Sequence, residues 1–120
     1  MTIHDKIKKL ILSNIKKPNE RTIGIEIENI IYNNKNERLP VNPGNHFSCF
    51  DLLQNLNDLI GKNGQYSLEP GGQLELSGAL LDSVHETCLE VATHLAEVKT
   101  IADRIGAGFI GLGSAPEWKH

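Results

Sequence analysis

The stretch "YSLEPGGQLELSG", residues 66–78, constrains the fold more than any other part of the chain. Apolar and polar residues alternate on both sides of a Pro-Gly-Gly interruption, which is the periodicity of half-buried strands. Proline and glycine weaken a strand interior, and glycine marks turns, bulges or close backbone approach. The pattern therefore predicts extended chain that is broken at residues 70–72. A bulge that re-aims Glu69 relative to Glu75 and a simple hairpin turn are both compatible with it.

Two more extended segments and three helices surround this stretch. Residues 22–32 ("TIGIEIENIIY") alternate as a strand does, and residues 108–113 ("GFIGLG") predict a last short strand. Apolar residues at helical spacing predict a first helix over residues 3–15. With the two later helices the order is αβαβαβ. That order predicts an α+β domain in which helices cover one face of a sheet.

The middle helix is predicted from a cap at its start. Ser48 and Asp51 have the spacing of a capping box, and Gly61 is placed to end the helix. The apolar stripe of this helix consists of Phe50, Leu53, Leu56 and Ile60.

The longest predicted helix begins after Ser83 and ends before Gly106. Ser83 with Glu86 forms a second capping box, and the glycine is suited to the left-handed residue that follows a helix. The apolar stripe predicts that Cys88 packs as a small hydrophobe and that His94, off its centre, is partly exposed. The stripe consists of Val84, Cys88, Val91, Leu95, Val98, Ala102 and Ile105.

Composition excludes several classes of function. The 120-residue chain has a net charge of −3 and a pI near 5.9, so it lacks the basic field that nucleic-acid binding requires. Cys49 and Cys88 are too few for a disulfide framework, and free thiols suit a reducing compartment. No apolar run approaches the ~20 residues of a membrane span, and no secretory leader is recognisable. We therefore expect a cytoplasmic single domain, residues 1–120, without nucleic-acid or membrane partners.

Three glutamates are predicted to share one face of the sheet. Glu26 and Glu28 lie two residues apart on one strand, so their carboxylates project from the same side roughly 7 Å apart. Glu75 lies in the second alternating run, on the opposite face of the strand from Leu74 and Leu76. If the two strands pair, the three carboxylates converge, and hard oxygen ligands without a nearby thiol favour Mg²⁺. The alternative is that these glutamates are solvated on the outer face of a half-exposed sheet.

Two motif matches fail on their structural context. Residues 106–111 ("GAGFIG") match the dinucleotide fingerprint, but a helix is predicted before them and a strand after them. A phosphate site needs the reverse order, with the helix N-terminus facing the phosphate. Residues 85–88 ("HETC") begin like a zinc-protease helix but have a cysteine in place of the second histidine.

The stretch "SLEPGGQLELSG" closely resembles the signature of glutamate–cysteine ligases of the plant and proteobacterial type. The segment "RTIGIEIE" is similar to the early G-x-E-x-E strand of that family. The segment "VHETCLEVATHLAEVKTIADRIGAGFIGLGSAPEW" is similar to the helix and glycine-rich strand that follow. The resemblance covers roughly residues 20–118, and the run around Pro-Gly-Gly is its most specific part.

The resemblance implies an ATP- and Mg²⁺-dependent ligation. The side-chain carboxylate of glutamate is phosphorylated, and the amine of cysteine then attacks the acyl phosphate to give γ-glutamylcysteine. This dipeptide begins glutathione biosynthesis, and related ligases make it for ergothioneine. Glutamate, cysteine and ATP are thus the implied small-molecule partners. The implied fold is a glutamine-synthetase-like catalytic domain whose antiparallel sheet forms a bowl for metal, nucleotide and amino acids.

The resemblance also implies roles for single residues. Glu26 and Glu28 match the metal-binding acids of the first strand, and Glu75 matches the acid of the second. No catalytic residue is implied beyond these metal ligands. The positions that match the surroundings of the glutamate pocket are Glu69, Gln73 and Ser77.

The chain departs from the family pattern at a few positions. A basic or aromatic residue is common where this chain has Asn29 and Ile30, and a polar residue is common at the position of Ala92. These departures leave the metal-binding acids in place and concern the positioning of substrates.

Length sets the last expectation. Family enzymes are several times longer, so we expect this chain to be the N-terminal part of such a catalytic domain, inactive alone. Three strands leave open sheet edges, which favour self-association. Two alternatives remain: a non-catalytic fragment that keeps Mg²⁺ or nucleotide binding, and a small α+β interaction module. Only the first of these is stabilised by Mg²⁺.

Overall fold

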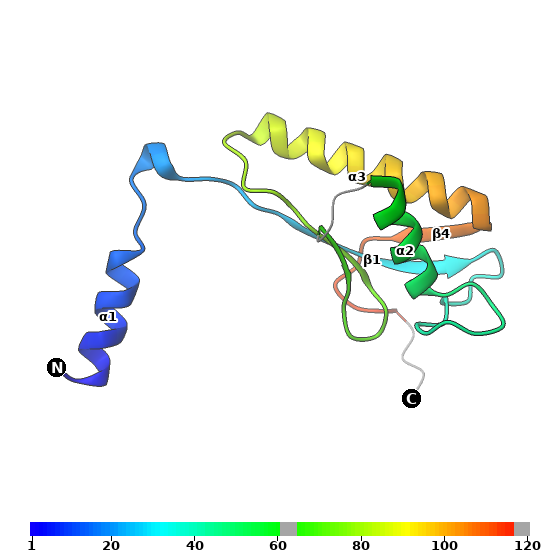
Figure 1. Cartoon of the computed structure of the whole chain (residues 1–120), viewed down its shortest axis with the longest axis horizontal. Coiled ribbons are helices and arrows are strands. Elements are labelled where there is room, and N and C mark those ends of the chain that lie inside the picture. Colours follow the sequence, from blue (N-terminus) through cyan, green and yellow to red (C-terminus); the bar gives the residue numbers. More distant parts are fainter. Residues whose placement is uncertain (61–64, 117–120) are drawn as a thin grey trace.

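The computed structural model describes residues 1–60 and 65–116. Figure 1 shows two helices above a sheet, with a third helix at the far end of an extended connection. The helices are α1 (Ile3–Ser13), α2 (Cys49–Ile60) and α3 (Val84–Ile105), with a 3-10 turn, η1, at Pro18–Glu20. The strands are β1 (Glu26–Asn33), β2 (Tyr66–Leu68), β3 (Leu74–Ser77) and β4 (Ala107–Ile110).

The four strands form one antiparallel sheet in the order β2-β3-β1-β4. The central strand is β1, which pairs with β3 along its first half and with β4 along its second half. Ile27 lies opposite Leu76 in the first pairing, and Ile31 lies opposite Phe109 in the second. Because side chains alternate between faces along a strand, these apolar residues share one face of the sheet.

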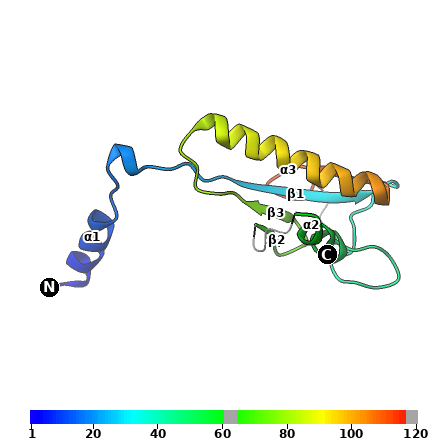
Figure 2. The same cartoon turned by 45° about the horizontal axis from the view of Figure 1, so that its top comes forward.

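Helices α2 and α3 both pack on this apolar face. Figure 2 shows α3 running along the length of β1. The expected α+β arrangement, an antiparallel sheet covered by helices on one face, is confirmed. The buried core joins both helices to three strands and consists of Ile31, Leu52, Leu56, Tyr66, Leu74, Leu76, Val98 and Ile101.

The Pro-Gly-Gly interruption is a hairpin turn between β2 and β3, so the single broken strand expected from the sequence is in fact two strands. The amide of Gly72 donates to the carbonyl of Glu69 (2.9 Å), which closes a turn with proline at its second position. Gly71 and Gly72 have φ angles of +91° and +80°, which residues with a side chain rarely adopt. The guanidinium of Arg38 donates to the Gly71 carbonyl and holds the tip of the turn. The interruption is therefore a hairpin turn, and its last residue, Gly72, has the left-handed conformation that is typical of a glycine bulge at the end of such a turn.

The helix ends agree with their sequence signals. Asp51 accepts from the amide of Ser48 and donates its own amide to the Ser48 hydroxyl, a complete capping box. Ser83 accepts from the amide of Glu86 at the start of α3, and Gly106 ends that helix with φ +65°. The role expected of Gly61 lies outside the described residues.

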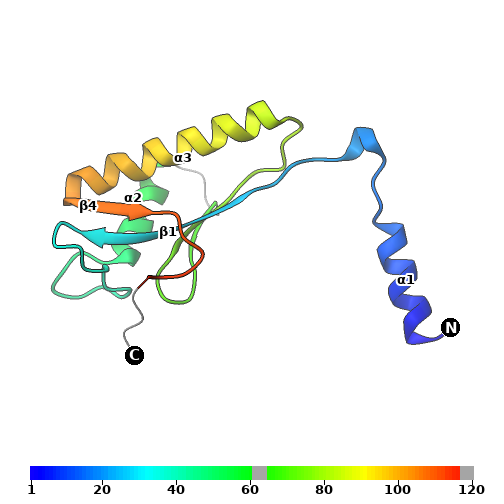
Figure 3. The ribbon, with the colours of Figure 1, turned by 180° about the vertical axis from the view of Figure 1, so that it is seen from behind.

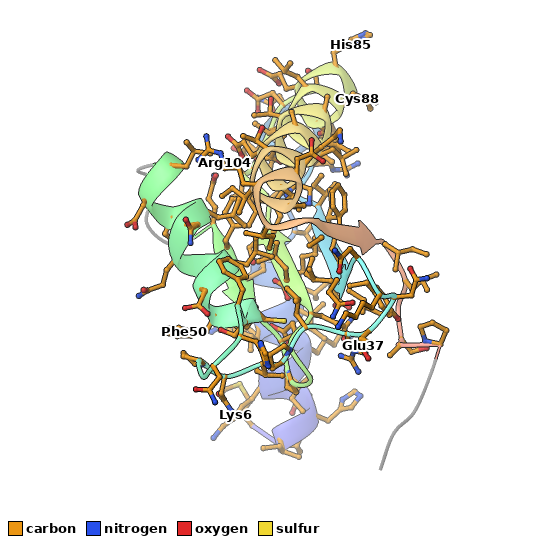
Figure 4. All side chains as sticks on the ribbon, turned by 90° about the vertical axis from the view of Figure 1, so that its right-hand side faces the viewer. Lys6, Glu37, Phe50, His85, Cys88 and Arg104 are labelled. Atoms are coloured by element: carbon orange, nitrogen blue, oxygen red, sulfur yellow. The ribbon has the colours of Figure 1, made fainter. Side chains whose placement is uncertain are left out.

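The buried face of α3 differs from the stripe expected from its sequence. His94 is 1% exposed rather than partly exposed, whereas Cys88 is exposed rather than packed. The reason is that the N-terminal part of α3 extends past the sheet, where Cys88 has nothing to pack on. Figure 4 shows His85 and Cys88 projecting from that end of the helix. A similar shift occurs in α2, where Leu52 is buried and Phe50 is 43% exposed.

The segment before β1 is less regular than expected. The strand predicted over residues 22–32 begins at Glu26, and Ile23 makes only an isolated bridge to Leu81. Helix α1 has no buried residue, and Figure 3 shows it pointing away from the sheet and the other helices. None of the helices in the described parts of the chain combines the length and apolarity that crossing a bilayer requires.

We expect Gly72→Ala to lower the free energy of unfolding by about 1–3 kcal/mol. An added Cβ would lie 2.8 Å from Val41 Cγ2 and 3.3 Å from Cys49 Sγ, in addition to the strain of a positive φ. Urea denaturation measures the change. The control is Gly44→Ala, because a Cβ at Gly44 meets nothing within 4 Å. Equal effects of the two substitutions would contradict this account of the turn.

Candidate metal and substrate face

The outer face of the sheet, away from the helices, gathers the glutamates predicted from the sequence. Glu28 lies directly opposite Glu75 in the β1–β3 register, and Ser67 of β2 lies opposite Glu75 on the other side. Glu26 lies opposite Ser77 two pairs further along the same two strands. The predicted convergence of the three acids on one face is therefore present, since cross-strand neighbours have Cβ atoms about 5 Å apart. We call the set Glu26, Glu28, Glu69, Gln73, Glu75 and Ser77 the acidic face.

Two neutral members of the acidic face hold the carboxylates in place. The Gln73 amide nitrogen donates to Glu28 Oε2 (2.8 Å), and the same nitrogen lies 3.4 Å from the Leu112 carbonyl oxygen. The Ser77 hydroxyl donates to Glu75 Oε1 (2.7 Å). Both residues were expected near a substrate pocket. In this structure each one contacts a proposed metal ligand.

The hairpin turn brings Glu69 back toward the other acids. A hydrogen bond with the Glu75 carboxyl, together with the charge of Glu75, raises the pKa of Glu69. The charges of Glu28 and Glu26 act in the same direction. Like charges this close repel one another, which is the physical cause of the shift.

Among the residues that the structure describes, no basic side chain forms an ion pair with these acids. Within residues 1–60 and 65–116 the one ion pair is Lys99–Asp103, on the exposed side of α3. Four carboxylates on one rigid face therefore lack an ion-pair partner. Such an arrangement favours an external cation, because like charges that are close together repel unless positive charge is supplied.

A shallow open cavity of about 430 Å³ adjoins the acidic face. It is lined by Glu26, Ile27 and Glu28 on one side and by residues 111–113 on the other. This glycine-rich segment follows β4, which itself follows α3. A helix therefore precedes residues 106–111 and a strand begins within them, as expected, and this order is the reverse of a dinucleotide-binding fingerprint. The segment places backbone, with little side-chain bulk, beside two of the acids.

The donor chemistry of the acidic face fits Mg²⁺, which binds carboxylate oxygens and retains several waters. Over the described ranges, however, no three acidic, histidine or cysteine side chains stand close enough to form a metal-binding group. The physical reason is that Glu28 and Glu75 are directed to Gln73 and Ser77. The residues that would hold a metal are thus Glu26, Glu28 and Glu75. Their carboxylates would have to turn toward the metal to bind it.

Beneath the acidic face lies a buried polar network that the sequence analysis missed. Asn29 is 2% exposed, and its side-chain nitrogen lies 2.9 Å from His94 Nε2. The other ring nitrogen of His94, Nδ1, lies 3.0 Å from the Tyr66 hydroxyl, which donates to Glu97 Oε2 (2.9 Å). Since the Asn29 amide is a donor, Nε2 of His94 accepts, and the ring proton is on Nδ1. The network joins β1, β2 and α3 directly behind Glu28.

A family model described as glutamate-cysteine ligase family 2 matches residues 22–120 of this chain. The chain belongs to the glutamate–cysteine ligase family 2. The matched region contains the whole sheet, the acidic face and helices α2 and α3. It excludes α1.

Curated relatives carry the same family name. The chain is 48% identical over 74 residues to the chloroplastic glutamate–cysteine ligase of Medicago truncatula, a match that covers 59% of this chain and 15% of the relative. It is 49% identical over 72 residues to ligase A of Oryza sativa, with 58% and 15% covered. It is 57% identical over 54 residues to the ligase of Arabidopsis thaliana, with 45% and 10% covered. The matched part is thus about one seventh or less of these relatives' length.

The comparison corrects one expectation. The cytoplasmic location expected for this glutamate–cysteine ligase family member is wrong, because the relatives it matches are named chloroplastic. Free cysteines favour only a reducing compartment, and the cytoplasm was inferred as the default one.

The departure from the family pattern at Asn29 has a structural role here. The residue faces the helices, not the acidic face, and its amide meets His94. Ile30, the other departure on β1, is 1% exposed and lies opposite Ile110 of β4. Asn29 therefore lies off the surface that carries Glu28 and Glu75, whereas Ile30, two residues after Glu28 on β1, is on the same face of the sheet as Glu28. Ala92 is exposed on α3.

We expect the free energy of unfolding to fall as pH falls below about 6.5. Burial lowers the pKa of His94 from 6.5, although the charges of Glu97 and Glu90 oppose the shift. The unfolded chain then binds a proton that the folded chain rejects, so the stability present above pH 6.5 is lost as pH falls to the folded pKa. Urea denaturation between pH 5 and 8 measures this slope.

The control for this slope is His94→Gln, which removes the titrating ring and leaves the other four histidines. The difference between the two proteins isolates the contribution of His94. Parallel stability–pH curves for the two proteins would contradict the assignment of a buried neutral ring.

Proposed function

We propose that this chain forms part of a glutamate–cysteine ligase catalytic domain, and that its acidic face holds Mg²⁺ for an ATP-dependent ligation. The ligation joins the side-chain carboxylate of glutamate to the amine of cysteine. The observation that carries the proposal is the alignment of Glu28 with Glu75 across β1 and β3, within the region matched by the family. Phosphoryl transfer requires from the protein mainly that it binds metal ions and positions the reactants.

The proposal assigns Glu26, Glu28 and Glu75 to the metal. A bound cation would supply the positive charge that offsets the mutual repulsion of these acids and that phosphoryl transfer requires. Gln73 and Ser77 act by fixing the carboxylates to which they donate, and Glu69 lies at the turn where the glutamate substrate is expected. Such supporting hydrogen bonds orient metal ligands and tune their affinity.

The proposal extends to the fold of the complete enzyme. An antiparallel sheet with helices on one face and acids on the other suits a glutamine-synthetase-like bowl, in which further strands would continue the sheet around the substrates. Glutamate, cysteine and ATP are then the substrates. In this arrangement the cavity between Glu28 and residues 111–113 opens toward the interior of the bowl.

We expect Mg²⁺ at millimolar concentration to raise the thermal unfolding midpoint of this chain by several degrees. A ligand at a hundredfold excess over its Kd stabilises the folded state by about 2.7 kcal/mol. Glu28→Gln and Glu75→Gln should each remove most of that rise. Scanning fluorimetry with and without Mg²⁺ and ATP measures it.

Asp58→Asn is the matched control for these variants, because Asp58 is exposed on α2, which packs on the opposite face of the sheet from the acidic face. It removes the same charge and should keep the full Mg²⁺ response. A wild-type chain that does not respond to Mg²⁺ would favour the interaction-module alternative, in which the acids are only solvated.

Activity is tested in a chimera. The segment of the Medicago truncatula ligase that corresponds to residues 22–120 of this chain is replaced by those residues, and γ-glutamylcysteine formation is measured. We expect the chimera to be active, and Glu28→Gln within it to reduce kcat/KM by about 100-fold or more. Gln73→Ala should cost about 10- to 100-fold through the carboxylate that it orients. An inactive, folded chimera that still binds Mg²⁺ would support the non-catalytic binding fragment instead.

A further inference from the structure

Helix α1 is an amphipathic helix, and the described parts of the chain bury none of its residues. Its apolar stripe consists of Ile3, Ile7, Leu10 and Ile11, and each of these is more than half exposed. A helix of 11 residues is marginal in water, even with the capping box that Thr2 and Asp5 provide. An apolar surface that covers this stripe would therefore stabilise the helix.

The charge of the N-terminal arm, residues 1–21, restricts what that surface can be. The arm has six basic residues and two acidic ones, whereas the remaining residues have six basic and thirteen acidic ones. At 100° per residue, Lys6 and Lys8 lie on the two flanks of the apolar stripe. Figure 4 shows Lys6 on the exposed helix. A suitable partner surface is apolar along its centre and acidic at its edges.

Such a surface lies on the flank of α3, over a cavity of about 310 Å³ next to the β2–β3 hairpin. Leu89 is 69% exposed there. The span from Glu86 to Glu97 is about 16 Å of helix, the same length as α1. We call this surface the α3 groove; the apolar residues Leu76, Leu81 and Leu89 and the acids Glu86, Glu90 and Glu97 line it.

We propose that α1 of one molecule docks in the α3 groove of a second copy of this chain, and that the exchange is reciprocal. Lys6 and Lys8 then face the acids of the groove while the apolar stripe covers Leu89. Reciprocal exchange gives a closed two-fold dimer in which both helices are covered. The arm lies before residue 22, where the family match begins, whereas the groove lies within the matched region.

The shape of the molecule favours the second copy over the helix's own chain. The bridge from Ile23 to Leu81 fixes the start of the body, and from there the arm runs outward, away from its own groove (Figure 3). The radius of gyration is 18.2 Å, against about 14 Å for a compact chain of this length. The helix is thus presented at a distance, where another molecule can receive it.

Sedimentation equilibrium at micromolar concentrations tests the proposal. We expect a dimer for the wild-type chain and a monomer for the double variant Ile7→Asp/Leu10→Asp. Leu12→Asp is the matched control, because Leu12 is 54% exposed on the opposite side of α1 and should leave the dimer intact. Circular dichroism confirms that each variant keeps the folded body.

The groove is tested in the same way. Leu89→Asp should weaken the dimer at least tenfold, whereas Leu95→Asp, on the other flank of α3 and 41% exposed, should not. Lys6→Glu/Lys8→Glu should also weaken it, and added salt should weaken the wild-type dimer.

Three outcomes would overturn the proposal. A monomeric wild-type chain with a reduced radius of gyration in solution scattering would show that α1 folds back on its own groove. A monomer that binds anionic phospholipid vesicles through α1 would show a membrane-surface helix. A dimer that ignores the changes in both α1 and the groove would show pairing through the sheet edges. None of these measurements depends on ligase activity.

Discussion

The antiparallel register of β1 on β3 is the constraint on which the rest of the structure depends. It sets Ile27 against Leu76 on one face and Glu28 against Glu75 on the other. Because side chains alternate along a strand, a slip of one residue would move the glutamates into the core and the apolar residues into solvent. Burial of Leu74 and Leu76 under the helices therefore specifies the alignment of the acids on the outer face. The packing energy of the apolar residues on one face of the sheet offsets the electrostatic repulsion among the glutamates on the other face.

The buried network gives this central strand a second fixed point. Asn29 follows Glu28 directly and is held by His94 of α3, which also meets Tyr66 of β2. Buried polar groups are costly unless every partner is satisfied, so the network permits few relative positions of β1, β2 and α3. The backbone that carries Glu28 is thus positioned by contacts on the opposite face from the one where a cation would bind. Helix α3 is part of the support of the candidate site although it contributes no residue to the acidic face.

Much of the fold and of the candidate site could be predicted from the sequence, because both follow from local patterns. The alternation around Glu26 and Glu75 predicted which side chains share a face, and Ser48 and Ser83 predicted where two helices begin.

What could not be predicted depends on where elements end and how they pack against one another. The stripe on α3 overestimated the packing of Cys88 because a helical pattern does not reveal where the sheet stops. His94 was missed because its partners are 28 and 65 residues away. A proline with two glycines signals a break but does not show that the chain reverses there, because the reversal depends on the pairing of Ser67 with Glu75.

The same register has a consequence for the order in which the chain folds. The β2–β3 hairpin joins residues close in sequence, such as Ser67 and Glu75, whereas β1 must find β3 from 47 positions away and β4 from as many as 80. Pairings that close long loops form slowly, so the hairpin is expected to precede the central strand. Glu69 and Glu75 meet early, on a locally formed hairpin, and Glu28 joins them only when the sheet closes. Opening of β1 alone would therefore disassemble the acidic face while the turn that marks the family in sequence stayed intact.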